Sequence, residues 1–185
     1  MKSVLIVHGT RGSPKENWFP WLKAELEKID CEVFVPQFPT PKNQSLENWK
    51  KVFEEYESRL DENSIFVGHS LGVPFLLSIL ENVKAKACFF VAGFTGPLGI
   101  DYDELNKDII EREFSWNKIK ENCKKFYLFQ SDNDPYVSLT RGEELAKDLG
   151  MENILVKNAG HFNAKAGYTE FPLLLNKIKN ELNRN

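Results

Sequence analysis

Gly68-His69-Ser70-Leu71-Gly72 is the stretch that decides the fold we predict. It follows a short apolar run at 64–67, typical of a buried strand, and precedes an apolar run at 73–80 that is long enough for a helix. Between a strand and a helix, the pattern G-x-S-x-G places the serine at the tip of a tight turn with its hydroxyl exposed. The sequence therefore predicts that Ser70 is a nucleophile.

The residues around Ser70 suit that role. Side chains two positions before and after it would collide in so sharp a turn, which explains Gly68 and Gly72. The helix after the turn directs free N–H groups toward the serine, so the Leu71 N–H is a natural donor to an oxyanion. A glycine-flanked serine also occurs in ordinary turns, so the prediction depends on a base and an acid elsewhere in the chain.

The composition limits the class of protein. The chain has 185 residues, a net charge of −3 and no dense cluster of Lys and Arg, which argues against a nucleic-acid partner. Its three cysteines (Cys31, Cys88, Cys123) are widely spaced and odd in number, which favours free thiols in a reducing compartment. No apolar run has the length of a signal sequence or a membrane span. We therefore expect a cytoplasmic protein with no membrane partner.

Six short, largely apolar runs alternate with helical patterns along the chain. Strands that are apolar throughout indicate a parallel sheet covered on both faces. We therefore predict an α/β fold with a three-layer, doubly wound sheet of about six parallel strands, helices on both faces, and one domain over 1–185. The expected strands are 4–7, 32–35, 64–67, 87–91, 126–130 and 153–156, and the expected helices lie near 17–29, 45–60, 73–80, 138–149 and 171–182.

One segment interrupts the alternation. Residues 94–125 are about twice as long as the crossover of a βα unit needs, and they carry many acidic residues. We expect a helix and an excursion over one edge of the sheet, which forms either a lid or pocket wall, or a solvated helix without a role at the site.

Polar residues follow three of the expected strands. Ser70 follows the third strand, Asp132 and Asp134 follow the fifth, and His161 follows the sixth. Carboxyl ends of parallel strands meet at one edge of a sheet, and the order Ser, Asp, His is that of an α/β-hydrolase triad. His161 would accept the serine proton and an aspartate would orient its ring. We favour Asp134, which precedes a proline, over Asp132.

The other two histidines suit other roles. His69 is adjacent to Ser70 on a sharp turn and points elsewhere, and His8 ends the first strand and shapes the loop after it. That glycine-rich loop offers the Thr10 N–H as a second oxyanion donor if the first strand lies beside the third. The loop lacks the spacing of phosphate and dinucleotide motifs, and dispersed histidines predict no metal site or cofactor. The candidate substrate pocket comprises Arg11, Trp18, His69, Phe94, Trp116 and Phe162.

Four motifs in order cover essentially the whole chain: V-H-G, G-H-S-L-G, S-D-N-D-P-Y-V-S and G-H-F-N-A-K-A-G-Y. They resemble those of the small serine hydrolases related to retinoblastoma-binding protein 9 and the bacterial YdeN-like proteins. The resemblance implies a trimmed α/β-hydrolase sheet with strand order 2-1-3-4-5-6, a triad of Ser70, Asp134 and His161, and hydrolysis of esters or amides. The retinoblastoma-binding motif L-x-C-x-E is absent, so that interaction is not expected.

We therefore predict a serine hydrolase that cleaves a small ester or amide through an acyl-enzyme. One alternative keeps the acyl-enzyme but passes the acyl group to an acceptor other than water. A second alternative is a binding module that uses the pocket, or residues 94–125, to hold a partner. An intact Ser, Asp and His set argues against a pure binding role, since binding does not need all three.

Overall fold

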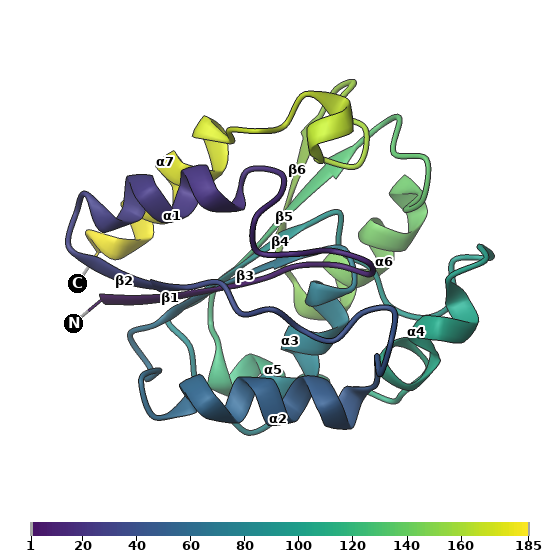
Figure 1. Ribbon diagram of the computed structural model, residues 1–185, viewed down its shortest axis with the longest axis horizontal. Helices are drawn as coiled ribbons and strands as arrows, with labels where there is room; N and C mark the ends of the chain where they lie inside the picture. Colours follow the sequence, from purple (N-terminus) through teal and green to yellow (C-terminus); the bar gives the residue numbers. More distant parts are fainter. Residues whose placement is uncertain (1, 185) are drawn as a thin grey trace.

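In the computed structural model, residues 2–184 are described, and six parallel strands form one sheet in the order β2-β1-β3-β4-β5-β6 (Figure 1). The predicted strand number, direction and order are confirmed. Residues 1 and 185, the ends of the expected domain, lie outside the described part. The strands are β1 (Lys2–Val7), β2 (Cys31–Phe34), β3 (Ile65–His69), β4 (Ala87–Val91), β5 (Phe126–Ser131) and β6 (Glu152–Val156).

The strands differ in burial according to their place in the sheet. Every residue of β3 and β4 is buried, as expected for central strands with helices on both faces. Within residues 2–184, β6 pairs with β5 alone, and the residues of β6 are exposed or half-buried. Leu155 on β6 is 50% exposed. The centre of the sheet, at β3 and β4, is therefore fully buried, and its edge at β6 is poorly covered.

Helices cover both faces of the sheet. One face packs against α1 (Phe19–Glu27) and α7 (Pro172–Leu182), which lie together on the same side in Figure 1. The other face packs against α2 (Leu46–Glu57), α3 (Gly72–Leu80), α5 (Trp116–Asn122) and α6 (Leu139–Leu149). Each face has its own apolar core, so the three-layer architecture is confirmed.

The observed helix ends lie within two residues of the expected ones, except that α2 ends at Glu57 and not near residue 60. α1 begins at Phe19, because Asn17 has φ +54 and therefore lies outside the helical region. Ser138 precedes α6 but its side chain forms no capping hydrogen bond, whereas Ser45 accepts one from the Asn48 N–H at 3.1 Å. Gly150 ends α6 in the left-handed conformation, with φ +65.

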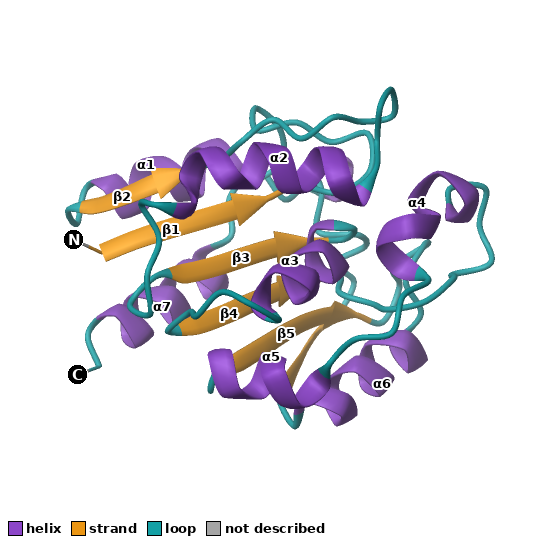
Figure 2. Ribbon diagram, turned by 90° about the horizontal axis from the view of Figure 1, so that it is seen from below, coloured by secondary structure: helices purple, strands orange, loops and turns teal. Residues whose placement is uncertain are grey.

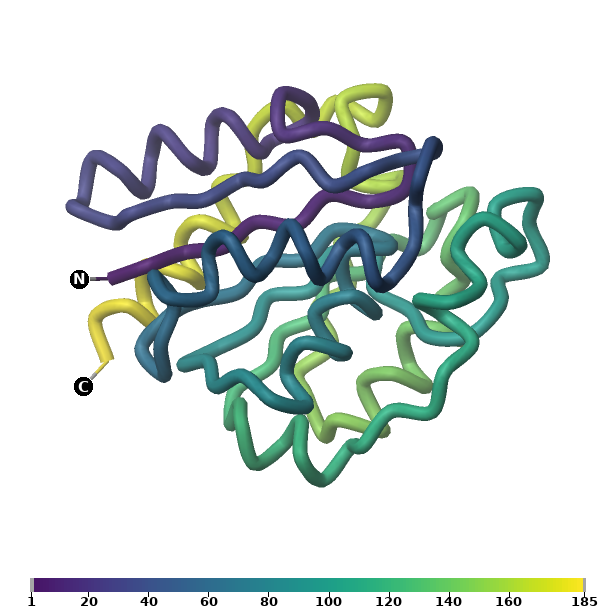
Figure 3. The backbone as a smooth tube through the Cα atoms, turned by 60° about the horizontal axis from the view of Figure 1, so that its bottom comes forward, coloured from purple at the N-terminus to yellow at the C-terminus, as the bar shows by residue number. Residues whose placement is uncertain are grey.

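Residues 94–125 contain two helices where one was expected. α4 (Asp103–Ile110) and α5 both contact α3 on the same side of the sheet. In Figure 2 the strand arrows point toward the side of the molecule on which α4 lies, and Figure 3 shows the same segment projecting at that end. The first half of the excursion therefore lies beside the carboxyl ends of the strands. None of the helices within residues 2–184 combines the length and the apolar character that crossing a membrane requires.

Candidate active site

The turn between β3 and α3 has the geometry expected of a nucleophile elbow. Ser70 has φ +54, a left-handed conformation that is costly for a residue with a side chain, and its N–H donates to the Val91 carbonyl at 2.9 Å. A Cβ on Gly68 would lie 3.1 Å from the Gly72 carbonyl oxygen. A Cβ on Gly72 would overlap the end of β1, within 2.9 Å of the His8 carbonyl oxygen. A side chain at position 72 would clash with this backbone, and one at position 68 would require its neighbours to shift.

His161 and Asp134 form a buried pair. The Nδ1–H of His161 donates to Asp134 Oδ2 at 2.8 Å, and the two side chains are 10% and 2% exposed. Asp134 Oδ1 accepts from the N–H groups of Tyr136 at 2.8 Å and Val137 at 3.1 Å. These backbone donors hold the carboxylate in one orientation. Because the pair uses Nδ1, the Nε2 atom of His161 is left to exchange a proton with another group.

The neighbouring aspartate has a different partner. Asp132 Oδ1 accepts from the Asn158 N–H at 2.7 Å, so it joins the loop after β5 to the loop after β6. Asn133 Oδ1 and Ser131 Oγ reinforce that connection through the N–H groups of Gly160 and Ala159. The structure thus places Asp134 on His161 and gives Asp132 a role in the loop.

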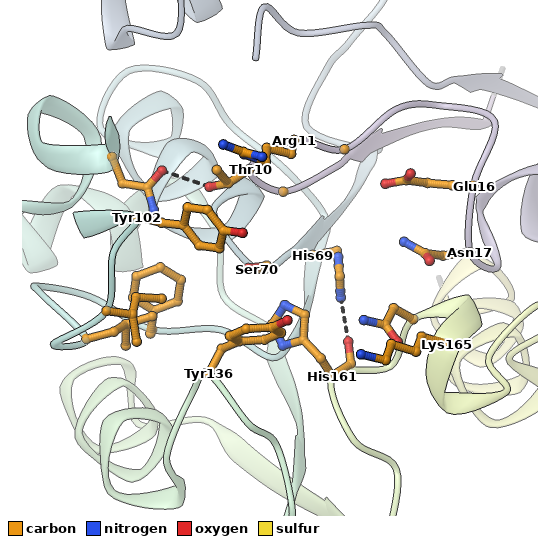
Figure 4. Close-up of a pocket in the computed structure, with 17 residues that line it drawn as sticks. Thr10, Arg11, Glu16, Asn17, His69, Ser70, Tyr102, Tyr136, His161 and Lys165 are labelled. Atoms are coloured by element: carbon orange, nitrogen blue, oxygen red, sulfur yellow. Dashed lines mark hydrogen bonds between the residues drawn. The ribbon is translucent and has the colours of Figure 1, made fainter. Parts of the chain in front are cut away.

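Ser70 and His161 line the same cavity, which has a volume of about 280 Å³ (Figure 4). Within residues 2–184, the Ser70 hydroxyl forms no hydrogen bond with His161 or any other side chain. Such bonds are often long in a free enzyme and shorten when substrate binds.

Two ring N–H groups donate hydrogen bonds to backbone carbonyls of the loop that carries His161. His69 Nε2–H donates to the His161 carbonyl at 2.8 Å, as the dashed line in Figure 4 marks, and Trp18 Nε1–H donates to the Phe162 carbonyl at 3.0 Å. Burial, and secondarily the nearby His161, lowers the pKa of His69 to about 3. His69 is therefore neutral at ordinary pH and supports His161 instead of competing with it for the serine proton.

His8 has the role in the loop that the sequence predicted. Its Nε2 accepts from the Phe38 N–H at 3.0 Å, and burial lowers its pKa, which keeps the ring neutral. Its side chain is fully buried behind the glycine-rich loop.

The loop after β1 approaches Ser70 closely. A Cβ on Gly9 would lie 2.9 Å from Ser70 Cβ and 3.3 Å from its hydroxyl oxygen, so a larger residue would not fit. Within residues 2–184, the N–H groups of Thr10 and Leu71 donate to no protein acceptor. Both candidate oxyanion donors therefore remain available on the two loops that meet at Ser70.

The predicted pocket residues lie in three different places. Arg11, His69 and Phe94 line the cavity. Trp18 and Phe162 are fully buried in the apolar core under α1 and α7, where their rings pack with Phe171. Trp116 lines a separate open hollow beside α4 and α5. The pocket prediction was wrong for these three because aromatic composition does not distinguish a cavity wall from a core.

Several cavity residues had not been predicted from the sequence. They come from the start of the excursion, from the segment before α1, and from the loops next to Asp134 and His161. These residues are Glu16, Asn17, Leu98, Ile100, Tyr102, Asn106, Tyr136, Asn163 and Lys165. Tyr136, Asn163 and Lys165 fall inside the quoted motifs, which was the only signal for them. In residues 2–184, no three His, Cys, Asp or Glu side chains converge as metal ligands would.

Comparisons with known proteins agree with this arrangement. The sequence family described as serine hydrolase matches residues 4–180. YdeN of Bacillus subtilis is 30% identical over 177 residues, which is 94% of this chain and 92% of YdeN. The serine hydrolase RBBP9 of Rattus norvegicus is 29% identical over 181 residues, covering 96% and 94% of the two chains.

Solved structures show the same fold. The crystal structure of the B. subtilis ydeN gene product superposes with a TM-score of 0.91 at 28% identity, covering 100% of both chains. The methylesterase MES16 from Arabidopsis has a TM-score of 0.72 over 97% of this chain and 98% of its own, at 11% identity, which shows the fold alone. This protein therefore belongs to the serine hydrolase family that includes YdeN and RBBP9, and it has the α/β-hydrolase fold.

Proposed function

We propose that this protein hydrolyses a small ester or amide with Ser70 as nucleophile, His161 as general base and acid, and Asp134 as the residue that orients His161. The observation that carries the proposal is the buried 2.8 Å pair of His161 Nδ1 and Asp134 Oδ2, in the same cavity as the strained Ser70 turn. A serine hydroxyl is a poor nucleophile at neutral pH, and such a pair supplies the base that it needs.

The reaction proceeds in two halves. Ser70 Oγ attacks the substrate carbonyl carbon as its proton passes to His161 Nε2, and Asp134 stabilises the imidazolium that forms. The N–H groups of Leu71 and Thr10 donate to the oxyanion. His161 then gives the proton to the leaving oxygen or nitrogen, which leaves an ester on Ser70. Water then attacks that ester as its proton passes to His161 Nε2. His161 returns the proton to Ser70 Oγ as the acid is released.

The cavity supports a small substrate. Its volume of about 280 Å³ lies just below the range of typical ligand sites, about 300–1,000 Å³. Phe94, Leu98 and Ile100 at the start of the excursion line it beside polar groups, so an apolar part of the substrate has a surface to contact. In this proposal the first half of residues 94–125 is a pocket wall.

Labelling with a fluorophosphonate probe tests the proposal, because the probe reacts with an activated serine. We expect labelling of the wild type and none of Ser70→Ala or His161→Ala. Ser138→Ala is the matched control, since Ser138 is exposed and forms no capping hydrogen bond. Folded protein that resists labelling, or Ser70→Ala that still reacts, would refute the proposal. Product analysis with added alcohol or amine then separates hydrolysis from acyl transfer.

A further inference from the structure

Asn106 on α4 is a buried polar residue that the mechanism does not use. It is 3% exposed and lines the cavity that holds Ser70 and His161. Its Oδ1 atom accepts from the Thr10 hydroxyl at 2.7 Å, marked by a dashed line in Figure 4, and from Gln44 Nε2 at 2.8 Å. A buried amide that faces a cavity requires an account of all its hydrogen bonds.

The surrounding hydrogen bonds fix which way this amide faces. Gln44 Nε2 also donates to the Leu105 carbonyl at 3.1 Å, and a carbonyl can only accept, so the orientation of the Gln44 amide is determined. Gln44 Nε2 must therefore donate to Asn106 as well, and the Asn106 atom that faces it is the oxygen. The NH2 group of Asn106 is left on the other side, and within residues 2–184 it has no acceptor.

A second donor without a partner within residues 2–184 lines the same cavity as Asn106. The Arg11 guanidinium lies 5.4 Å from the centre of the Tyr102 ring and forms no ion pair within residues 2–184. The Arg11 N–H donates to Thr40 Oγ1 at 2.6 Å, and Thr40 in turn donates to Gln44 Oε1 at 2.6 Å. The Arg11 backbone and the Asn106 side chain are therefore held by one network, and both residues line the same cavity.

We propose that Asn106 and Arg11 form a subsite for a carboxylate on the substrate. A carboxylate only accepts hydrogen bonds, and these two side chains present only donors to the cavity, one of them charged. Glu16 and Lys165 also line the cavity, but Figure 4 shows both of them across it from Tyr102, against which Arg11 lies. Glu16 Oε1 accepts from the Ser13 N–H. The inference rests on the proposed function and narrows its substrate to esters or amides that carry a carboxylate.

Matched ester pairs test the subsite. One pair is 4-nitrophenyl hemiglutarate and its methyl ester, with the charge on the acyl side. The other is 4-acetoxyphenylacetate and its methyl ester, with the charge on the leaving side. We expect the wild type to favour the anionic member of at least one pair by about tenfold or more in kcat/KM, mostly through KM, as one charged hydrogen bond is worth.

Asn106→Asp isolates the donor. The aspartate keeps an oxygen for Thr10 and Gln44 but turns an acceptor toward the cavity, so the preference for the anionic ester should be lost while the neutral ester is still turned over. Asn17→Asp is the matched control, because Asn17 also uses its Oδ1 as an acceptor, for the Ala164 N–H at 2.8 Å, and lines the other side of the cavity. If both variants lose the preference equally, general charge repulsion is the cause and the subsite is refuted.

The outcomes separate the two proposals. Ser70-dependent turnover of neutral esters with no preference for either anionic ester refutes the subsite and leaves the hydrolase. A different outcome would support the subsite and refute the hydrolase. In that outcome, calorimetry shows that Ser70→Ala binds monomethyl glutarate more tightly than dimethyl glutarate, and the wild type turns over none of the esters. Should Asn106→Asp not fold, Arg11→Gln replaces it, since Arg11 is exposed and its loss should also abolish the anionic preference.

Discussion

Asp134→Asn keeps the shape of the side chain and removes its charge, and the hydrogen bonds around it determine how the site responds. Oδ1 accepts from the N–H groups of Tyr136 and Val137. Because backbone N–H groups only donate, the amide oxygen of an asparagine stays on them and its NH2 group faces His161. His161 Nδ1 must then accept, so the ring proton moves to Nε2, which can no longer take a proton from Ser70.

The size of the loss follows from the lost charge pair. A carboxylate and an imidazolium about 4 Å apart attract by about 4 kcal/mol at an effective dielectric constant of about 20. That attraction exists only once the imidazolium has formed, so its loss should lower kcat by about 10³-fold, and the wrong tautomer adds to the loss. Asp132→Asn is the matched control. Its amide oxygen still accepts from Asn158, so kcat should stay within about threefold.

The assay is steady-state hydrolysis of a 4-nitrophenyl ester, with the rate of fluorophosphonate labelling as a second measure. Thermal unfolding establishes that both variants are folded. A folded Asp134→Asn that retains kcat within tenfold of wild type would refute the reasoning. An equal loss of kcat in Asp132→Asn would mean that the loop after β5 as a whole, and not Asp134 alone, supports His161.

Two further variants test the surroundings of Ser70. Gly72→Ala should cost about 1–3 kcal/mol of unfolding free energy in urea and lower kcat about tenfold, because its Cβ would force α3 and the Leu71 N–H away from β1. Gly150 has φ +65 and open space around it, so Gly150→Ala should lower the stability and leave kcat unchanged. Equal kcat values for Gly72→Ala and Gly150→Ala would contradict this account. His69→Gln should reduce the amount of unfolding free energy that is lost as the pH falls. Because the pKa of His69 lies near 3 when folded and near 6.5 when unfolded, the wild type loses up to about 1.4 kcal/mol per pH unit as pH falls from 6.5 toward 3. The measurement is the unfolding free energy in urea from pH 7 to pH 4. An equal decrease with pH in the wild type and in His69→Gln would contradict this expectation.

Much of the fold could be predicted from the sequence, for a physical reason. Each strand is an apolar run bounded by turn residues, and a run that is buried on both faces has no alternation to obscure it. The Ser70 turn is also recognisable, since Gly68 and Gly72 are imposed by backbone contacts. The strand order depended on the resemblance, because nothing local in an apolar strand specifies its neighbour.

Side chains were harder to place than elements. Trp18 and Phe162 lie next to a helix start and a site histidine, as pocket residues would, but both rings point into the core. Whether an aromatic ring packs inward depends on contacts between residues as distant as 18 and 171, which periodicity does not report. Asn106 was missed for the same reason. Its significance comes from Thr10 and Gln44, which lie 96 and 62 residues away in sequence.

The position of β6 bears on how activity and folding are linked. His161 follows the last strand of the sheet, which has one neighbour and little burial, while Ser70 follows a fully buried central strand. Edge elements with few buried contacts open locally at lower free energy than the whole domain unfolds. Fraying of β6 would move His161, the proposed base, away from Ser70, which would stay held by β3. Under the proposed mechanism, activity therefore depends on an edge strand with little burial, and heat or denaturant should abolish activity before the core unfolds.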